Sequence, residues 1–174
     1  AGGYNQHHGW ILWMLGEHYR FTRDEAWLRR SAPGIVKGAD WIIRETARLL
    51  IRATQDLGNP NDFIGHIGGD DFVIVTTPDK VDTIAQKIVD DFEKIAPSFY
   101  NDVDRSAGFI VGKDRKGVEQ KFGLLSISIG VVSNEKKELT HVAQIAEIGA
   151  ELKEAAKRLE RSSIVKDKRS DISR

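Results

Sequence analysis

The alternation of hydrophobic and polar positions changes its period along the chain, and each period predicts a different element. Residues 38–57, GADWIIRETARLLIRATQDL, carry apolar side chains at three- and four-residue spacing, which predicts an amphipathic helix that ends at Gly58 and Pro60. Two short runs rich in aromatic and β-branched residues, DFIGHI and DFVIVTT, follow with glycines between them. They predict a β-hairpin whose turn is formed by Gly68 and Gly69.

The pattern after the hairpin predicts alternating helices and strands. A helix is expected from Pro78, with Thr77 as its cap, to Pro97. The stretch SAGFIVGKDRKGV is interpreted as a small excursion with glycine bends, and FGLLSISIGVVS as a buried strand. A second amphipathic helix in HVAQIAEIGAELKEAAKRL and a short last strand in SSIVKDKR complete the order. The predicted order of elements is thus helix, hairpin, helix, strand, helix and strand. This order indicates an α/β fold with helices on a sheet.

The first part of the chain has a different character, because all four tryptophans lie within residues 1–41. Trp10, Trp13 and Met14 have helical spacing, and TRDEAWL predicts a helix that restarts with a cap at Thr22. Two short helices joined by a bend are therefore expected before the longer helix, which crosses the junction. We divide the chain into a tryptophan-rich helical segment, residues 1–44, and an α/β part, residues 45–174.

Composition and charge exclude several classes of partner. Lys and Arg total 26 and Asp and Glu total 26, so no overall field favours nucleic acid or an anionic membrane. The absence of cysteine excludes disulfides, thiolate nucleophiles and cysteine-ligated zinc. Apolar runs such as WILWML are far shorter than the roughly 20 residues of a membrane span. We expect a cytoplasmic protein without nucleic-acid or membrane partners.

The segment GHIGGDDF combines the predicted turn with two adjacent carboxylates, Asp70 and Asp71. A tight turn accounts for the glycines but not for the doubled charge. Because side chains alternate along a strand, Asp70 and Phe72 are expected on one face and Asp71 on the other. Carboxylates suit Mg²⁺, which usually binds through one or two of them plus substrate phosphates, and bare glycine amides let a phosphate approach. The segment is consistent with nucleotide chemistry and also with a plain turn.

Three motifs in order resemble the GGDEF domain of diguanylate cyclases: GGDDF in a hairpin, SISIGVV on a strand and AAKRLERSS after a helix. The resemblance covers about residues 45–170. It implies a nucleotidyl-cyclase-like mixed sheet flanked by helices, GTP binding with Mg²⁺ as the cofactor, and homodimers that make cyclic di-GMP.

The resemblance also implies roles for individual residues. Gly68 and Gly69 would lie against the guanine nucleotide. Asp70 would be the metal ligand and catalytic base, and Asp71 would take the second acidic, catalytic position. Lys157 and Arg161 would contact the triphosphate, although Glu160 replaces the glycine that the family usually has there.

The chain departs from the family where the first strand belongs. The Asp-x-Asp-x-Phe-Lys motif that supplies the second metal carboxylate is not visible, and a helical segment replaces that strand region. At the product-inhibition site, Asn59 replaces an arginine while Asp62 is kept, so bidentate recognition of the product is lost. Because two-metal chemistry needs both carboxylates, we expect a degenerate domain with weak GTP and Mg²⁺ binding and little or no cyclase activity.

The first 45 residues resemble one helical hairpin of the six-hairpin (α/α)₆ glycosidases, without an identifiable pair of catalytic carboxylates. This resemblance suggests a chimera of two unrelated pieces. The alternative to the signalling domain is therefore a non-enzymatic recombinant or designed chimera, or a protein-interaction or regulatory module, with no nucleotide function.

Overall fold

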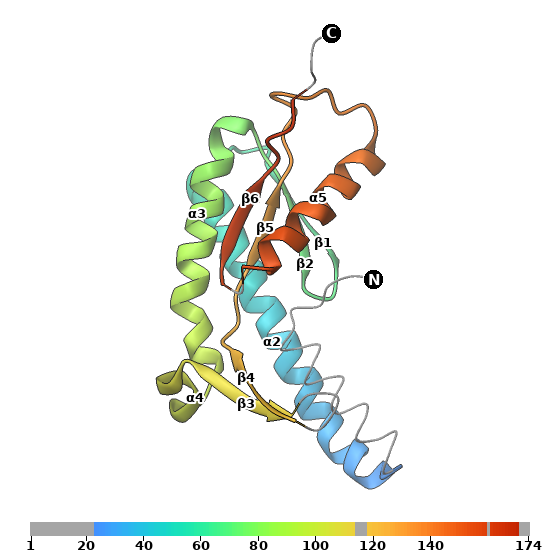
Figure 1. Ribbon diagram of the computed structural model, residues 1–174, viewed down its shortest axis with the longest axis vertical. Coiled ribbons are helices and arrows are strands. Elements are labelled where there is room, and N and C mark those ends of the chain that lie inside the picture. Colours follow the sequence, from blue (N-terminus) through green and yellow to red (C-terminus); the bar gives the residue numbers. More distant parts are fainter. Residues whose placement is uncertain (1–22, 114–117, 160, 171–174) are drawn as a thin grey trace.

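The computed structural model describes residues 23–113, 118–159 and 161–170, and in this part the protein is a mixed α/β structure (Figure 1). Its helices are α2 (Glu25–Leu57), α3 (Pro78–Ile95), the 3₁₀ helix η1 (Ala96–Phe99), α4 (Asp102–Ala107) and α5 (Val142–Lys157). Its strands are β1 (Phe63–Gly68), β2 (Asp71–Val75), β3 (Phe109–Lys113), β4 (Glu119–Gly123), β5 (Ser128–Val131) and β6 (Ser163–Lys166).

The described strands form three separate two-stranded sheets. β1 pairs with β2 and β3 with β4, both antiparallel, while β5 and β6 are parallel. The α/β fold class is confirmed at this level. The single nucleotidyl-cyclase-like sheet is not formed by these strands alone and stays a prediction.

α2 is one continuous helix of 33 residues, not a short helix followed by a second one. Its N-cap is Asp24, whose carboxylate accepts a hydrogen bond from the Trp27 N–H at 2.8 Å. The cap predicted at Thr22 is therefore wrong for this helix, because the chain supplies a better acceptor two residues later. Pro33 lies inside the helix without ending it.

The junction between the two predicted parts lies within this helix. The expected boundary between residues 44 and 45 falls in the middle of α2, as the prediction of a helix across the junction required. The helix predicted around Trp10 and Trp13 lies outside the described residues.

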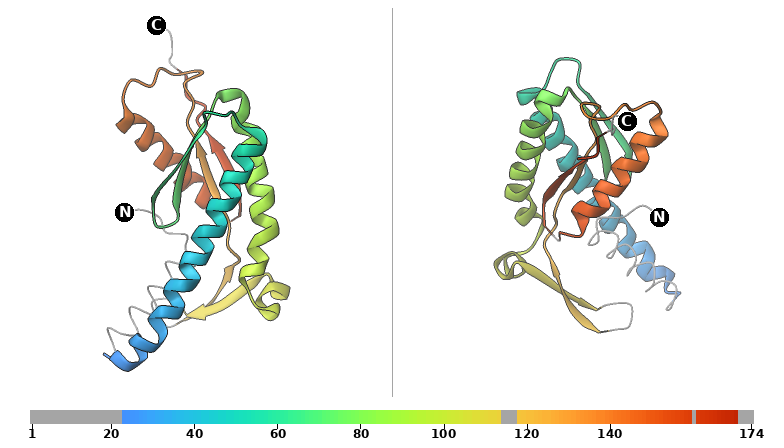
Figure 2. Two further views of the ribbon diagram at one scale, coloured as in Figure 1. Left: turned by 180° about the vertical axis from the view of Figure 1, so that it is seen from behind. Right: turned by 45° about the horizontal axis from the view of Figure 1, so that its top comes forward.

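The core forms where the second half of α2 packs against α3. Leu50 and Ala53 of α2 meet Ile84, Ile88 and Phe92 of α3, and all five are buried. Side chains of β2, of β5 and of the residue before β5 close this core from the other side; they are Phe72, Ile74, Ile129 and Ile127. α2 and α3 thus lie on one face of the strands and α5 on the other (Figure 2).

The β1–β2 hairpin forms where the alternating pattern predicted it, but its turn is shifted by one residue. Gly68 pairs with Asp71, so the two turn residues are Gly69 and Asp70 instead of Gly68 and Gly69. The register slips between His66 and Gly68, which leaves Ile67 as an extra, bulged residue. This bulge moves the turn, and Gly69 supplies the positive φ of 56° that it requires.

α3 begins after Thr77 and ends at Ile95, as predicted from its apolar spacing and from Pro97. Thr77 takes the N-cap position, but its side chain makes no capping hydrogen bond. Its hydroxyl instead accepts a hydrogen bond from the Asn59 side-chain amide at 2.9 Å, which ties the start of α3 to the end of α2.

The segment between α3 and β5 contains more regular structure than the predicted excursion. It forms η1, α4 and the β3–β4 pair. The predicted buried strand is interrupted: its first two residues end β4, Ser128–Val131 form β5, and residues 124–127 between them are not in a strand. The last helix and the last strand are confirmed as α5 and β6. α5 packs closely on β5, because a Cβ built on Gly130 would lie 2.9 Å from the Gly149 carbonyl oxygen.

Candidate functional site

The glycine turn and the end of α5 line one end of a large open groove. The groove has a volume of about 1560 Å³ and lies between β2 and β5. Of the predicted site residues, Gly69, Asp70, Asp71 and Lys157 line it. The structure therefore brings the turn carboxylates and one of the two predicted cationic residues to the same groove, although they are far apart in the sequence.

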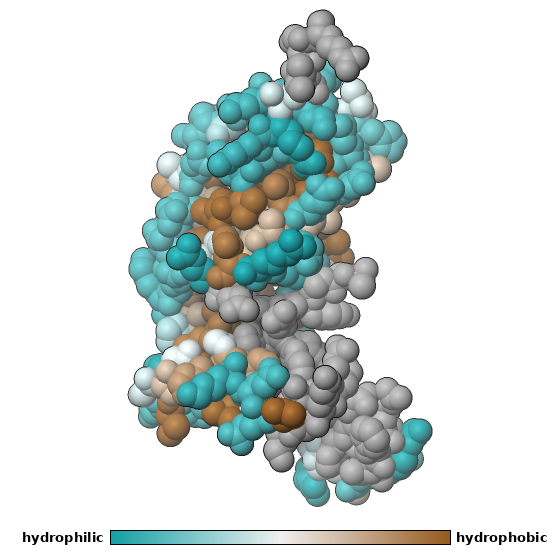
Figure 3. Space-filling view, in the orientation of Figure 1, coloured by the Kyte–Doolittle hydropathy of each residue, from teal (hydrophilic) through white to brown (hydrophobic). Residues whose placement is uncertain are grey.

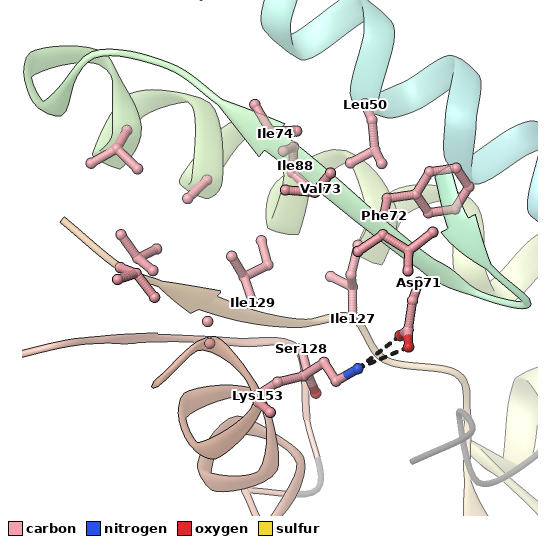
Figure 4. A pocket seen from close by; sticks show the side chains of 18 of the residues that line it. Leu50, Asp71, Phe72, Val73, Ile74, Ile88, Ile127, Ser128, Ile129 and Lys153 are labelled. Atoms are coloured by element: carbon pink, nitrogen blue, oxygen red, sulfur yellow. Dashed lines mark hydrogen bonds and ion pairs between the residues drawn. The ribbon is translucent and has the colours of Figure 1, made fainter. Parts of the chain in front are cut away.

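Asp71 forms the best-defined polar contact of this site. The Lys153 ammonium of α5 donates to both Asp71 carboxylate oxygens, at 2.9 and 3.0 Å (Figure 4). Both side chains are about one-third exposed, which makes this a half-buried ion pair. It joins the hairpin to α5 and places a cation beside the second acidic position.

Asp70 occupies the turn itself and is exposed. Asp70 and Phe72 do not simply share a strand face as predicted, because Asp70 precedes β2 and belongs to the turn. Phe72 points into the core, while Asp71 projects from the opposite side of β2 toward α5. The predicted alternation of side-chain direction along the strand is confirmed for Asp71 and Phe72.

The two predicted triphosphate contacts are placed differently. Lys157 is the last residue of α5, is partly buried and lines the groove. Arg161 follows the helix in the connection to β6, is exposed, and is not among the residues that line the groove. Gly68 likewise is not a lining residue and closes the hairpin as the partner of Asp71.

Asp62 has a structural role at the opposite end of the hairpin from the turn. Its carboxylate accepts hydrogen bonds from the Asn59 N–H and from the Thr76 hydroxyl, both at 2.8 Å. The bond from the Asn59 backbone, together with the Thr76 bond, holds the pKa of Asp62 below its usual range. Asn59 was expected only to replace an arginine that the family has at this position. In the structure it donates hydrogen bonds that hold the Asp62 carboxylate in place.

A magnesium site here would need more than protein carboxylates. Within residues 23–113, 118–159 and 161–170, no group of three or more His, Cys, Asp or Glu side chains could hold a metal ion. The donor set at the turn is two adjacent carboxylates, which matches the one or two that Mg²⁺ takes when phosphates complete its coordination. Both oxygens of Asp71 already accept hydrogen bonds from Lys153, so of these two carboxylates Asp70 is the one that could bind a metal without displacing Lys153.

Two residues of the site were not predicted. Lys153 lies one helical turn before Lys157, and this i, i+4 spacing puts both ammonium groups on one face of α5, a signal that the sequence contained. His66 stacks on Phe72 with ring centroids 4.7 Å apart, and its Nε2 lies 2.9 Å from the Gly69 carbonyl oxygen. It fixes the turn from the facing strand, where cross-strand pairing could have indicated it.

Comparison with known proteins adds no relative: no protein-family model, curated protein or solved structure matches the chain. Among the described helices, none is both long enough and apolar enough to cross a membrane.

Proposed function

We propose that the chain is a degenerate GGDEF-type domain of cyclic di-GMP signalling, which binds GTP with Mg²⁺ weakly and has little or no diguanylate cyclase activity. The observation that carries this proposal is that two carboxylates, of Asp70 and Asp71, and two α5 lysines, Lys153 and Lys157, line the same groove, where Lys153 pairs with Asp71. Carboxylates and ammonium groups side by side are what a magnesium–phosphate ligand requires.

In this proposal, each residue has one chemical task. Asp70 holds Mg²⁺ together with the phosphates and helps to deprotonate a ribose 3′ hydroxyl. Lys157, with Lys153 beside it, neutralises the triphosphate, whereas Arg161 does not line the groove and is given no role in this proposal. Two protomers, each with one GTP, would have to meet for cyclic di-GMP to form. Mg²⁺, when bound, supplies charge stabilisation to the phosphates.

Two features account for the low activity proposed. The first-strand motif with the second metal carboxylate is not found in the sequence, and two-metal phosphoryl transfer needs ligands on both sides of the reacting phosphate. Lys153 already neutralises Asp71, so a metal at that position would have to compete with an ammonium group. GTP binding is therefore expected to survive better than turnover.

The test is calorimetric titration of GTP into the protein with Mg²⁺ and then with EDTA. Binding that depends on Mg²⁺ at about one site per chain is expected, and Lys157→Ala should weaken it roughly tenfold through loss of a charge-assisted contact. Lys168→Ala, an exposed lysine in the C-terminal segment, is the matched control. Absence of heat under both conditions would contradict the proposal.

A second candidate is a non-enzymatic interaction or regulatory module, or a chimera without nucleotide function. The Asp71–Lys153 pair favours it, because this contact satisfies the turn charge without any ligand. In that case GTP and Mg²⁺ would leave the unfolding temperature unchanged, whereas a ligand that binds the native state raises it. Chromatography that detects cyclic di-GMP after long incubation with GTP and Mg²⁺ distinguishes an active cyclase from the degenerate domain and from the interaction module.

A further inference from the structure

The Asp71–Lys153 pair differs from an ordinary ion pair on the protein surface. The Lys153 ammonium donates to both Asp71 carboxylate oxygens, and the Lys153 and Asp71 side chains are only 27% and 34% exposed. The Lys166–Asp82 pair also joins distant elements, but its Asp82 side chain is 69% exposed. Because water and salt screen a half-buried pair less, the Asp71–Lys153 pair resists exchange with another cation more strongly.

The groove around the pair is largely apolar. Val73, Ile127 and Ile129 line it near the pair (Figure 4). Apolar side chains also reach the surface between α3 and α5 (Figure 3). Such surroundings lower the local dielectric constant, so a carboxylate without a partner there would be costly. Asp71 therefore needs a cation beside it, and Lys153 is that cation.

The backbone holds both partners of the pair in place. Asp71 begins β2 and pairs with Gly68 across the hairpin turn. Lys153 lies in α5, which packs so closely on β5 that a Cβ built on Gly130 would be 3.0 Å from the Lys153 backbone nitrogen. The position of the ammonium beside Asp71 therefore follows from the packing of α5 on β5.

We propose that Lys153 takes the place of a second metal ion, so that the site binds GTP with a single Mg²⁺, at Asp70. This inference rests on the function proposed above. Mg²⁺ gives up its hydration water reluctantly, and at Asp71 it would also have to displace an ammonium group from both carboxylate oxygens. Lys153 thus excludes a metal from Asp71 and supplies positive charge in its place.

An ammonium group reproduces only part of what a metal ion does. It carries three N–H donors, and two contacts to Asp71 leave one that can donate to a phosphate oxygen in the groove. It can therefore neutralise charge on the triphosphate. It has no coordination position for an attacking oxygen, however, so it cannot activate a nucleophile as a metal ion can. A lysine in place of the metal thus retains nucleotide binding and removes turnover.

The test is the Mg²⁺ dependence of GTP binding, measured by calorimetry with the full chain. One series uses enough free Mg²⁺ to saturate the nucleotide, and a second series uses about ten times more. The GTP affinity of the unsubstituted chain should be the same in both series. In Lys153→Gln, Asp71 is open to a second ion, so the added Mg²⁺ should raise the GTP affinity by up to about tenfold.

Two variants serve as controls. Lys153→Arg keeps a cation that can contact both Asp71 oxygens, and it should restore the behaviour of the unsubstituted chain. Lys168→Gln removes an exposed lysine of the C-terminal segment and should leave the Mg²⁺ response unchanged. If Lys153 only stabilised the fold, Lys153→Gln would weaken GTP binding equally in both series, and this result would overturn the inference.

A GTP affinity of the unsubstituted chain that rises with added Mg²⁺ would also overturn the inference. Either result leaves the proposed function standing, whereas absence of GTP binding in every chain would contradict both. If Lys153→Gln does not fold, electron paramagnetic resonance of the unsubstituted chain with GTP and Mn²⁺ decides. The signal of isolated Mn²⁺ supports the inference, and the signal of two coupled ions overturns it, because paired catalytic metals lie only about 4 Å apart.

Discussion

The β5–β6 and β3–β4 pairs have the same number of strands but opposite surroundings. β5–β6 lies between the α2–α3 core and α5, and Val131 at its end is 6% exposed. β3–β4 extends away from the core, and Val111 in its middle is 55% exposed (Figure 1). Two strands alone are marginal in water. The comparison therefore teaches that the elements packed on a strand pair, more than the pairing itself, set its contribution to stability.

The largest expected difference between the two pairs is at their glycines. Gly130→Ala in β5 would put a Cβ 2.9 Å from the Gly149 carbonyl oxygen and 3.0 Å from the Lys153 nitrogen. Because these are backbone atoms of a packed helix, we expect a loss of roughly 3 kcal/mol in unfolding free energy. Gly123→Ala in β4 meets no atom within 4 Å and should change it by less than about 0.5 kcal/mol. Urea unfolding measures both, and equal losses would contradict the comparison.

The same substitution of a valine in each pair gives a second contrast. Val131→Ala removes two buried methyl groups and should cost about 2 kcal/mol of unfolding free energy. Val111→Ala, on the exposed pair, should cost less than about 0.5 kcal/mol. Chemical denaturation under identical conditions compares them. A similar cost at Val111 would mean that the β3–β4 pair is covered by something beyond the described residues.

The connection between the β3–β4 pair and the β5–β6 pair, hereafter the joint, is held by a hydrogen bond of Tyr100. Its hydroxyl accepts a hydrogen bond from the Leu125 N–H at 2.8 Å, in the segment that connects β4 to β5. Tyr100→Phe leaves this N–H without its acceptor, and we expect a loss of about 1 kcal/mol in thermal or urea unfolding. Ser98→Ala, which removes an exposed hydroxyl nearby, is the control. A loss that is no larger than the control's would show that the joint does not need this bond.

The smallest expected effect is the pH dependence of the same joint. Burial raises the pKa of Tyr100 above its ordinary value of 10.0. The native state therefore holds this proton more tightly than the unfolded chain, so its contribution is fully present below pH 10 and is lost as the pH rises through the raised pKa. Unfolding free energy should fall more steeply above pH 10 in the unsubstituted chain than in Tyr100→Phe. Parallel curves would contradict this.

Local signals predicted the elements better than they predicted the contacts between them. The apolar spacing that ends at Pro97 located α3, and the alternation in DFVIV located β2. The turn moved by one residue because Ile67 bulges, which depends on pairing that periodicity does not contain. Thr77 was placed correctly as the N-cap residue, but its hydroxyl bonds to Asn59, 18 residues away.

Contacts between distant residues were even harder to predict at the candidate site than in the rest of the fold. The glycines and aspartates of the turn are adjacent in sequence, so their grouping was visible at once. Lys153 meets Asp71 across 82 positions, and only the packing of α5 on β5 brings them together. Arg161, chosen for its place in a motif, is exposed and does not line the groove, which its position in the sequence could not reveal.

The length of α2 has a consequence for how the protein opens. Pro33, Gly34 and Gly38 lie within six residues, and a helix interior disfavours proline by about 3 kcal/mol and each glycine by about 1 kcal/mol relative to alanine. Among the side chains described in this helix, the first buried one is Thr46. The described side chains of the first half are thus less buried than those of the second, and we expect its backbone hydrogen bonds to break in local fluctuations that leave the second half intact. One helix in shape, α2 is expected to behave as two cooperative units when it unfolds.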